Sequence, residues 1–293
     1  MGHTSSIIGM ASVVVIVALT APVVRAGGDA DAHYRQGIAY KEQGKIDEAI
    51  AELENAVSAQ PQHGMAWASL GQLYKKQAAF DKAVLAYEKA TAILTEDAIL
   101  WSNLGMAYYR AGRVDDALGA LAKSCRLDPN IAEVRGNLGT MKRQQGDIAG
   151  AILQLRKAVK LAPREPTYHN NLGIALRAGD NNEEAIEEFR QAIALDGANA
   201  DYHFNLGVAY RRQEMVDEAI VAYREAVTLD PKLFSAWYDL GHMYRLDHDN
   251  GKAIEAFAKY LELARGKDPD SDRRAEDEIE SLGGTAKKAA KGK

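Results

Sequence analysis

The sequence has very little cysteine and no excess of positive charge. Its one cysteine, Cys125, has no partner for an intrachain disulfide, so the fold must be stabilised by packing. We expect Cys125 to be a buried and inert thiol, because cysteines without such a role behave as small apolar residues. The 36 lysines and arginines are outnumbered by 41 aspartates and glutamates, and the net charge of -5 argues against nucleic acid as the main ligand.

Motifs of enzymes are also missing. The chain has no glycine-rich phosphate-binding loop and no Ser-His-Asp arrangement in a plausible context. His169 and His203 recur at the same position of two successive packed helices, about 10 Å apart, which is too far for bonds of roughly 2 Å to a shared zinc ion. We therefore predict no catalytic residue, no metal site and no cofactor.

What the sequence does contain is a strict repeat of 34 residues. Seven glycines recur at this spacing without an insertion: Gly37, Gly71, Gly105, Gly139, Gly173, Gly207 and Gly241. Seven alanines follow them at a fixed offset of twelve residues: Ala49, Ala83, Ala117, Ala151, Ala185, Ala219 and Ala253. A fixed period of this length indicates a two-helix unit that cannot bury its apolar face alone, so the core must run through stacked neighbours.

One unit, residues 98–131, shows the whole pattern: Trp101, Leu104, Gly105, Tyr108, Ala117 and Pro129. The chain resembles tetratricopeptide repeat proteins, whose repeat has these residue types at this spacing. The resemblance implies an all-α, right-handed superhelical solenoid of seven helix-turn-helix repeats with a C-terminal capping helix. The repeats would occupy residues 30–63, 64–97, 98–131, 132–165, 166–199, 200–233 and 234–267.

Each repeat, numbered 1 to 34, should pack two helices against each other. The tryptophan, leucine, glycine and tyrosine of unit 98–131 lie at i, i+3, i+4 and i+7, on one face of a first helix. Glycine at unit position 8 and alanine at position 20 are small enough to let the two backbones approach. His169 and His203 stand at position 4, and we expect them to fill the place of the tryptophan.

The start of the sequence predicts a location. Residues 7–19 are a nearly uninterrupted apolar run, followed by Pro22 and by the small residue Ala26. This order is typical of a secretory signal peptide over residues 1–26, which would make the array periplasmic or secreted. The alternative is an uncleaved segment that anchors the array to the inner membrane and provides its only membrane contact.

The end of the sequence differs from the repeats. Ala275, Ile279 and Leu282 lie at i, i+4 and i+7 among many charged residues, so we expect a capping helix over residues 268–282 that shields the last apolar face. Residues 283–293 are rich in lysine, alanine and glycine. They are predicted to be a disordered tail.

The resemblance implies a concave groove lined by the first helices, and a series of amides lies on it at position 6: Asn103, Asn137, Asn171 and Asn205, followed by Asp239. Each amide can donate to and accept from a peptide backbone, whatever side chains the peptide carries. The series is similar to the asparagines that hold substrate backbone in the repeat domain of protein O-GlcNAc transferases. Asparagine is also common at this position in the family generally, so a purely structural role remains open.

A basic series at position 12 follows the same groove: Arg143, Arg177, Arg211 and Arg245. Arginine pairs with carboxylates in a bidentate, planar manner, which favours an acidic or C-terminal-carboxylate ligand. Cations that only complement the dipole at the end of the first helix are the alternative explanation. Asn170, Phe204 and Tyr238 complete the predicted peptide site, whose centre we expect in the fifth to seventh repeats.

The sequence thus predicts a non-enzymatic adaptor that binds an extended, acidic protein or peptide segment and assists assembly of a cell-envelope complex, such as a pilus, motility or secretion machine. Two alternatives stay open. One is a self-associating structural scaffold, in which the array forms a homo-oligomer and the groove is incidental. The other is a regulatory or substrate-recruiting subunit of an enzyme encoded elsewhere.

Overall fold

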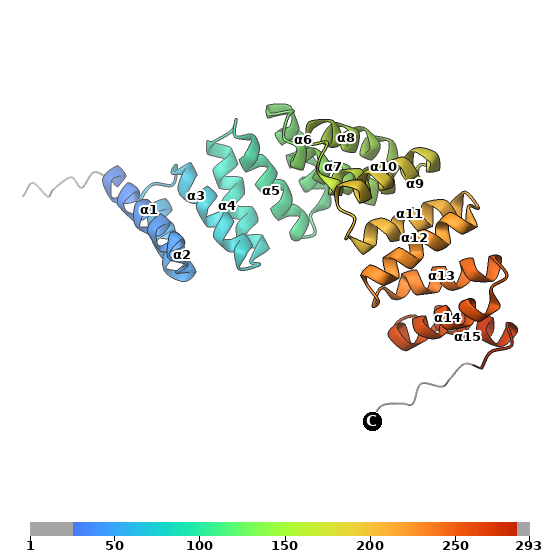
Figure 1. Ribbon diagram of the computed structural model, residues 1–293. Helices are drawn as coiled ribbons and strands as arrows, with labels where there is room; N and C mark the ends of the chain where they lie inside the picture. The colour runs from blue at the N-terminus through green and yellow to red at the C-terminus, as the bar shows by residue number, and fades with distance from the viewer. Residues whose placement is uncertain (1–25, 286–293) are drawn as a thin grey trace, which may run out of the picture.

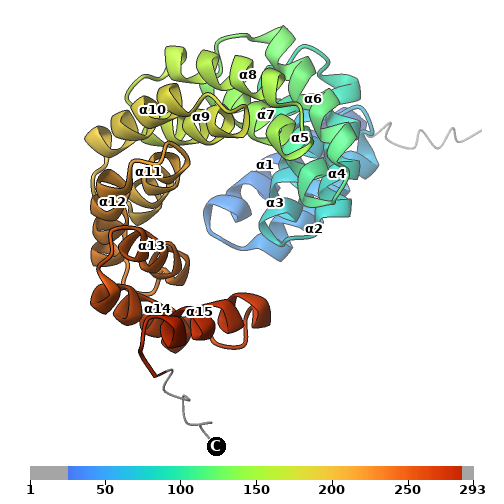
Figure 2. The same ribbon diagram turned by 90° about the vertical axis from the view of Figure 1, so that its right-hand side faces the viewer.

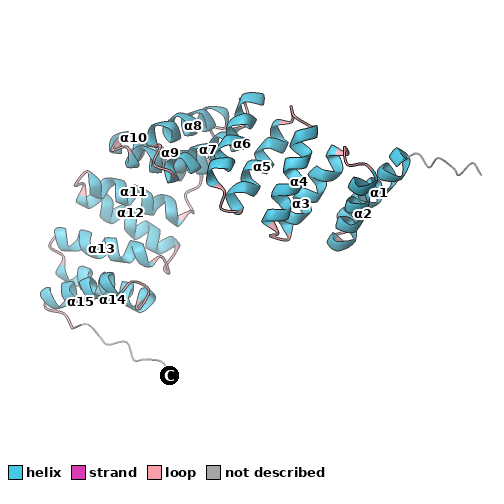
Figure 3. Cartoon of the chain, turned by 180° about the vertical axis from the view of Figure 1, so that it is seen from behind, coloured by secondary structure: helices cyan, strands magenta, loops and turns pink. Residues whose placement is uncertain are grey.

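The computed structural model describes residues 26–285, and every regular element in this range is an α-helix (Figure 3). The first helices of the repeats are α1 (Ala26–Glu42), α3 (Gly64–Lys76), α5 (Ala98–Arg110), α7 (Ala132–Gln144), α9 (Pro166–Ala178), α11 (Ala200–Arg212) and α13 (Phe234–Leu246). The second helices are α2 (Ile46–Ala59), α4 (Phe80–Ile93), α6 (Val114–Leu127), α8 (Ile148–Leu161), α10 (Asn182–Leu195), α12 (Val216–Leu229) and α14 (Asn250–Ala264). A last helix, α15 (Pro269–Ser281), follows them. The prediction of an all-α repeat solenoid is confirmed.

The helices begin and end where the sequence has suitable chemistry. The carboxylate of Asp97 accepts a hydrogen bond of 2.9 Å from the backbone N–H of Leu100 at the start of α5. Pro166 opens α9, where its missing N–H would have had no helical partner. The first helices end before a residue in the left-handed conformation, a common stop for helices. Glycine holds it in three repeats and other residues in four: Gly44, Gly112, Gly146, Ala78, Asp180, Glu214 and His248.

The two helices of a repeat lie very close together. All seven alanines at position 20 are fully buried. A methyl group added at Gly173 would lie 2.7 Å from the ring of Phe189, and one added at Gly207 would lie 2.7 Å from the ring of Tyr223. The prediction that glycine and alanine permit this approach is therefore confirmed.

The repeats follow a curved path, which gives the array a concave and a convex surface (Figures 1 and 2). In Figure 2, α7, α9, α11 and α13 lie toward the inside of the curve, and α8, α10, α12 and α14 lie toward the outside. First helices also contact each other directly, α7 with α9 and α9 with α11. The concave surface is accordingly lined by first helices.

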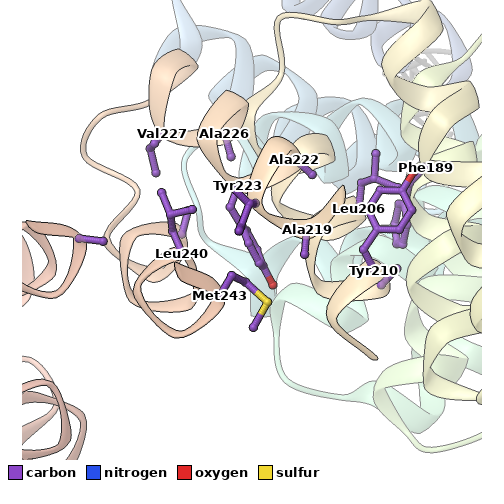
Figure 4. Close-up of a cluster of buried hydrophobic side chains, with 14 of the residues drawn as sticks. Phe189, Leu206, Tyr210, Ala219, Ala222, Tyr223, Ala226, Val227, Leu240 and Met243 are labelled. Atoms are coloured by element: carbon purple, nitrogen blue, oxygen red, sulfur yellow. The ribbon is translucent and has the colours of Figure 1, made fainter. Parts of the chain in front are cut away.

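The buried core extends from repeat to repeat. Its largest cluster runs from Ala151 in α8 to Ile279 in α15, and part of this cluster around Tyr223 is shown in Figure 4. Cys125 belongs to a smaller cluster between α6 and α7 and is buried, as predicted. Burial raises the pKa of its thiol, which disfavours the reactive thiolate.

Position 4 makes the same hydrogen bond in six repeats, although three residue types occupy it. Each side chain donates to the backbone carbonyl six residues earlier, at 2.8 to 3.1 Å: Trp67 to Pro61, Trp101 to Thr95, Arg135 to Pro129, His169 to Pro163, His203 to Gly197 and Trp237 to Pro231. The bond ties each first helix to the loop before it. His169 and His203 thus take the tryptophan position, as predicted, and make its hydrogen bond, but the smaller ring of His203 leaves part of the space empty.

The two ends of the array are different. Within residues 26–285, α1 is the first helix, and the predicted signal peptide lies outside the described residues except for Ala26. At the other end α15 packs on α14, with Ala275 and Ile279 buried. Most of the predicted tail, residues 286–293, also lies outside the described range. No helix between residues 26 and 285 is long and apolar enough to cross a membrane.

Candidate functional site

The predicted peptide-binding residues all belong to first helices. The position 6 residues lie in α5, α7, α9, α11 and α13, which line the concave surface (Figure 2). The structure places these helices along one concave surface, which we call the groove, but gives the predicted residues different surroundings. Three of the asparagine side chains make no hydrogen bond to a described residue. The position 6 residues toward the carboxyl end, in contrast, form hydrogen bonds or ion pairs with other residues of the protein.

The free amides belong to three successive repeats. Asn103, Asn137 and Asn171 are half-buried, and their side chains make no hydrogen bond to any residue between 26 and 285. A half-buried amide without a protein partner keeps both its donor and its acceptor available to a ligand. These three residues form what we call the amide series.

Asn205 differs from them because its amide is already used. Its Nδ2 donates to Oδ1 of Asn170 at 3.0 Å, which links α11 to α9. Asn170 itself is only 8% exposed, so it is a buried partner of Asn205 rather than an open groove residue. The unusual asparagine at position 5 of this repeat is the sequence feature that could have indicated the pair.

Arg177 is a half-buried arginine of the basic series. Its Nη1 donates to the backbone oxygen of Asn205 at 3.3 Å, and its guanidinium lies 5.7 Å from the centre of the Phe189 ring. Burial lowers the pKa of Arg177, and the neighbouring charges of Arg212, Arg143 and Arg211 lower it further. Among the described residues neither Arg177 nor Arg143 forms an ion pair with a carboxylate. The helices that carry Asn137 and Asn171 therefore also carry arginines without a carboxylate partner in the described part of the chain.

The next arginine, Arg211, has a partner. Its Nη1 lies 3.4 Å from Oδ1 of Asp239, whose side chain is only 13% exposed. Burial raises the pKa of Asp239, and the charge of Arg211 opposes this shift. Asp239 lies next to the buried hydroxyl of Tyr223, whose pKa is raised mainly by burial. Phe204 packs against the same tyrosine, with 5.8 Å between ring centres.

The last repeat is covered by α15. Oε1 of Glu278 lies 3.3 Å from Nη1 of Arg245 and 4.0 Å from Nδ1 of His242. Tyr238 packs on His242 with 4.7 Å between ring centres. Burial lowers the pKa of His242, and Glu278 opposes this shift. Sequence reasoning missed Glu278, because nothing in the repeat pattern indicates which face of the last helix meets α13.

Comparison with known proteins identifies the family. The profile described as the cilia and flagella-associated protein 70 C-terminal domain, a tetratricopeptide repeat domain, matches residues 16–232, and the tetratricopeptide repeat profile matches residues 234–267. The chain is a tetratricopeptide repeat protein. No curated protein sequence matches it. Tetratricopeptide repeats generally serve as non-catalytic scaffolds for protein interaction, and no catalytic family is among the matches.

Solved structures of tetratricopeptide repeat proteins have the same fold. A crystal structure of MamA is 30% identical, with a TM-score of 0.54 over 56% of this chain and 96% of MamA. YrrB, described as having an unusual peptide-binding site, is 22% identical, with a TM-score of 0.56 over 66% of this chain and 98% of YrrB. PilF of Pseudomonas aeruginosa is also 22% identical, with a TM-score of 0.57 over 70% of this chain and 94% of PilF. YrrB and PilF show the shared fold, while the family matches and MamA support an adaptor for protein–protein interaction. The similarity of the asparagine series to that of O-GlcNAc transferases stays a prediction.

Proposed function

We propose that the protein is a non-enzymatic adaptor that holds an extended acidic segment of a partner in its concave groove, centred on the third to fifth repeats. One observation carries the proposal: Asn137 and Asn171 of the amide series share helices α7 and α9 with Arg143 and Arg177, and neither arginine has a carboxylate partner among residues 26–285. The amides would hold the backbone of the segment. The arginines would pair with its carboxylates.

The dimensions are compatible with an extended peptide. Helices that pack at 8 to 10 Å place successive amides roughly 10 Å apart, and an extended chain advances about 3.3 Å per residue. Each amide would then serve about three residues of the ligand. A segment of roughly nine residues would engage all three.

The proposal includes a location and a role. The predicted signal peptide supports a periplasmic or secreted protein, and an uncleaved segment would instead anchor the array to the inner membrane. In either place the adaptor would help assemble a cell-envelope complex such as a pilus, motility or secretion machine. Self-association into a scaffold is the competing outcome.

A capture experiment tests the proposal. The full-length protein and a variant with Asn103, Asn137 and Asn171 changed to alanine are compared as baits in envelope extract. A second variant, with Gln62, Gln145 and Gln213 changed to alanine, is the matched control because these exposed amides make no side-chain hydrogen bond within residues 26–285. We expect a partner that the groove variant loses and the control retains, with unchanged helicity in both.

Salt and concentration separate the alternatives. Binding of an acidic segment should weaken as salt rises, because the interaction is partly screened. Apolar self-association should not weaken in this way. If all three baits capture the same partner, or only another copy of the array, the amide series is structural and the proposal fails.

A further inference from the structure

A regular pairing on the convex side of the repeats is broken in one place. Position 4 of the first helix faces position 23 of the second helix. Three repeats combine tryptophan with alanine: Trp67 with Ala86, Trp101 with Ala120 and Trp237 with Ala256. Three others have a hydrogen-bonded polar pair at 2.6 to 2.7 Å: His33 with Glu52, Arg135 with Gln154 and His169 with Glu188. Both solutions fill the space between the helices.

The sixth repeat has neither solution. His203 at position 4 faces Ala222 at position 23, so it has neither the bulk of a tryptophan nor a polar partner there. The Nε2 of His203 donates to the Gly197 carbonyl at 3.0 Å, which holds the ring toward the loop. A cleft therefore opens between α10 and α12, above α11, and its volume is about 630 Å³.

The equivalent place in the seventh repeat shows what the missing tryptophan does. The cleft between α12 and α14 has corresponding lining positions, including Leu240, Tyr244 and Ala256, but it also contains Trp237. Its volume is only about 220 Å³. The larger cleft of the sixth repeat thus has room for an aromatic side chain that the chain itself does not supply.

The cleft has an apolar lining. Ile193 and Ala194 of α10, Leu206 of α11 and Ala222 of α12 contribute apolar surface, and Leu206 and Ala222 are labelled in Figure 4. At its edge Val221 is 66% exposed. An apolar lining of this kind favours a large apolar side chain over a water-filled space.

The rim of the cleft is acidic. Asp217, Glu218 and Glu225 contribute to it, and none of them forms an ion pair with a described residue. The one basic residue there, Arg190, donates to the hydroxyl of Tyr210 at 3.0 Å. The positions equivalent to Glu218 and Glu225 in the seventh repeat are lysines, so the acidic rim is not a general property of these helices.

We propose that this cleft is a second binding site, which accepts a tryptophan side chain from a partner segment whose neighbouring residues are lysine or arginine. The indole would occupy the place that Trp237 fills in the next repeat. The basic neighbours would meet the three carboxylates of the rim. The site lies on the side opposite the groove and has the opposite charge preference, so one adaptor would bind an acidic segment inside the curve and a basic, aromatic segment outside it.

The test uses the full-length protein and three labelled peptides of five residues. The first has a central tryptophan flanked by lysines, the second a central tryptophan flanked by glutamates, and the third a central alanine flanked by lysines. Fluorescence anisotropy measures the affinity, and the methyl NMR signals of Ile193 and Val221 show whether the peptide binds in the cleft. We expect the first peptide to bind at least tenfold more tightly than the others, and a tenfold difference in affinity corresponds to about 1.4 kcal/mol. The first peptide should also shift both methyl signals.

His203→Trp is the decisive variant because it fills the cleft as Trp237 does in the next repeat. Its affinity for the first peptide should fall at least tenfold while its thermal unfolding midpoint stays equal or rises.

The charge of the rim is tested separately. The double change Glu218→Lys and Glu225→Lys should lower the affinity for the first peptide and raise it for the second without altering the fold. The alanine variant of the amide series should bind the first peptide as well as the unchanged protein does. The proposal is overturned by any one of three results: the first peptide still binds to His203→Trp, the alanine peptide binds as tightly as the first, or the first peptide does not bind detectably.

Discussion

The middle and the carboxyl end of the groove have similar polar residues at position 6, yet they differ in which side chains are free to bind a ligand. In α5, α7 and α9 the position 6 amides have no partner within residues 26–285. In α11 and α13 the equivalent residues are taken, Asn205 by Asn170 and Asp239 by Arg211. A repeated motif therefore identifies a face of the array, while the contacts of each residue decide whether it can serve a ligand.

The difference has a structural origin. α15 closes the last repeat with its buried Ala275 and Ile279, and it also brings Glu278 beside Arg245 and His242. In this way the protein places its own carboxylate where an acidic ligand would otherwise lie. The expected centre of binding therefore moves from the fifth to seventh repeats toward the third to fifth.

The largest effect should come from releasing α15. Ile279 is 1% exposed, and Ile279→Ala should lower the stability of the carboxyl end by about 2 to 5 kcal/mol because a buried side chain is truncated. Hydrogen exchange along α15 and urea unfolding measure this loss. Glu280→Ala, on the exposed side of the same helix, is the control. Equal stability of the two variants would show that α15 is not held by its apolar contact.

A direct comparison of two asparagines comes next. Asn205→Ala removes the partner of the buried Asn170 amide and should cost about 1 to 3 kcal/mol in the free energy of unfolding. Asn137→Ala removes a side chain without a described partner and should change stability by less than about 0.5 kcal/mol. Urea midpoints of the two variants test this contrast. Similar losses in both would mean that the middle amides are structural as well.

Much of the fold could be predicted because the period has no insertion. A fixed spacing of glycine and alanine identifies the faces of both helices, and Gly173 and Ala185 do pack as that spacing requires. The contact between Asn205 and Asn170 could not be predicted in the same way, because it depends on side-chain directions across two neighbouring repeats. The break at His203 and Ala222 was present in the sequence, but it becomes informative only when positions 4 and 23 are known to face each other.

A smaller effect concerns the pH dependence of stability. Burial raises the pKa of Asp239 in the folded state, so the folded protein binds this proton more tightly than the unfolded chain does. The contribution of Asp239 to the free energy of unfolding should therefore rise as the pH falls through the raised pKa of the folded state. The rise ends at about pH 3.9, which is the pKa of aspartate in the unfolded chain. Asp239→Asn should lack this gain, while loss of the partly exposed pair with Arg211 costs less than about 1 kcal/mol.

Urea unfolding of the unchanged protein and Asp239→Asn at neutral and mildly acidic pH measures the difference. Asp277→Asn, on an exposed part of α15, is the control. A stability difference between Asp239→Asn and the unchanged protein that is constant with pH would contradict the raised pKa.

A small change in stability should also follow Glu278→Gln, which removes the carboxylate beside Arg245 but keeps the shape of the side chain. The pair is partly exposed, so the stability loss should be only about 0.2 to 1 kcal/mol. Its effect on binding is more informative. If an acidic peptide reaches the last repeat, Glu278→Gln should strengthen its binding several-fold, because Arg245 then lacks an internal partner. If the affinity is unchanged while the alanine variant of the amide series abolishes binding, the ligand ends before α13 and the two parts of the groove have separate roles, one in recognition and one in closing the array.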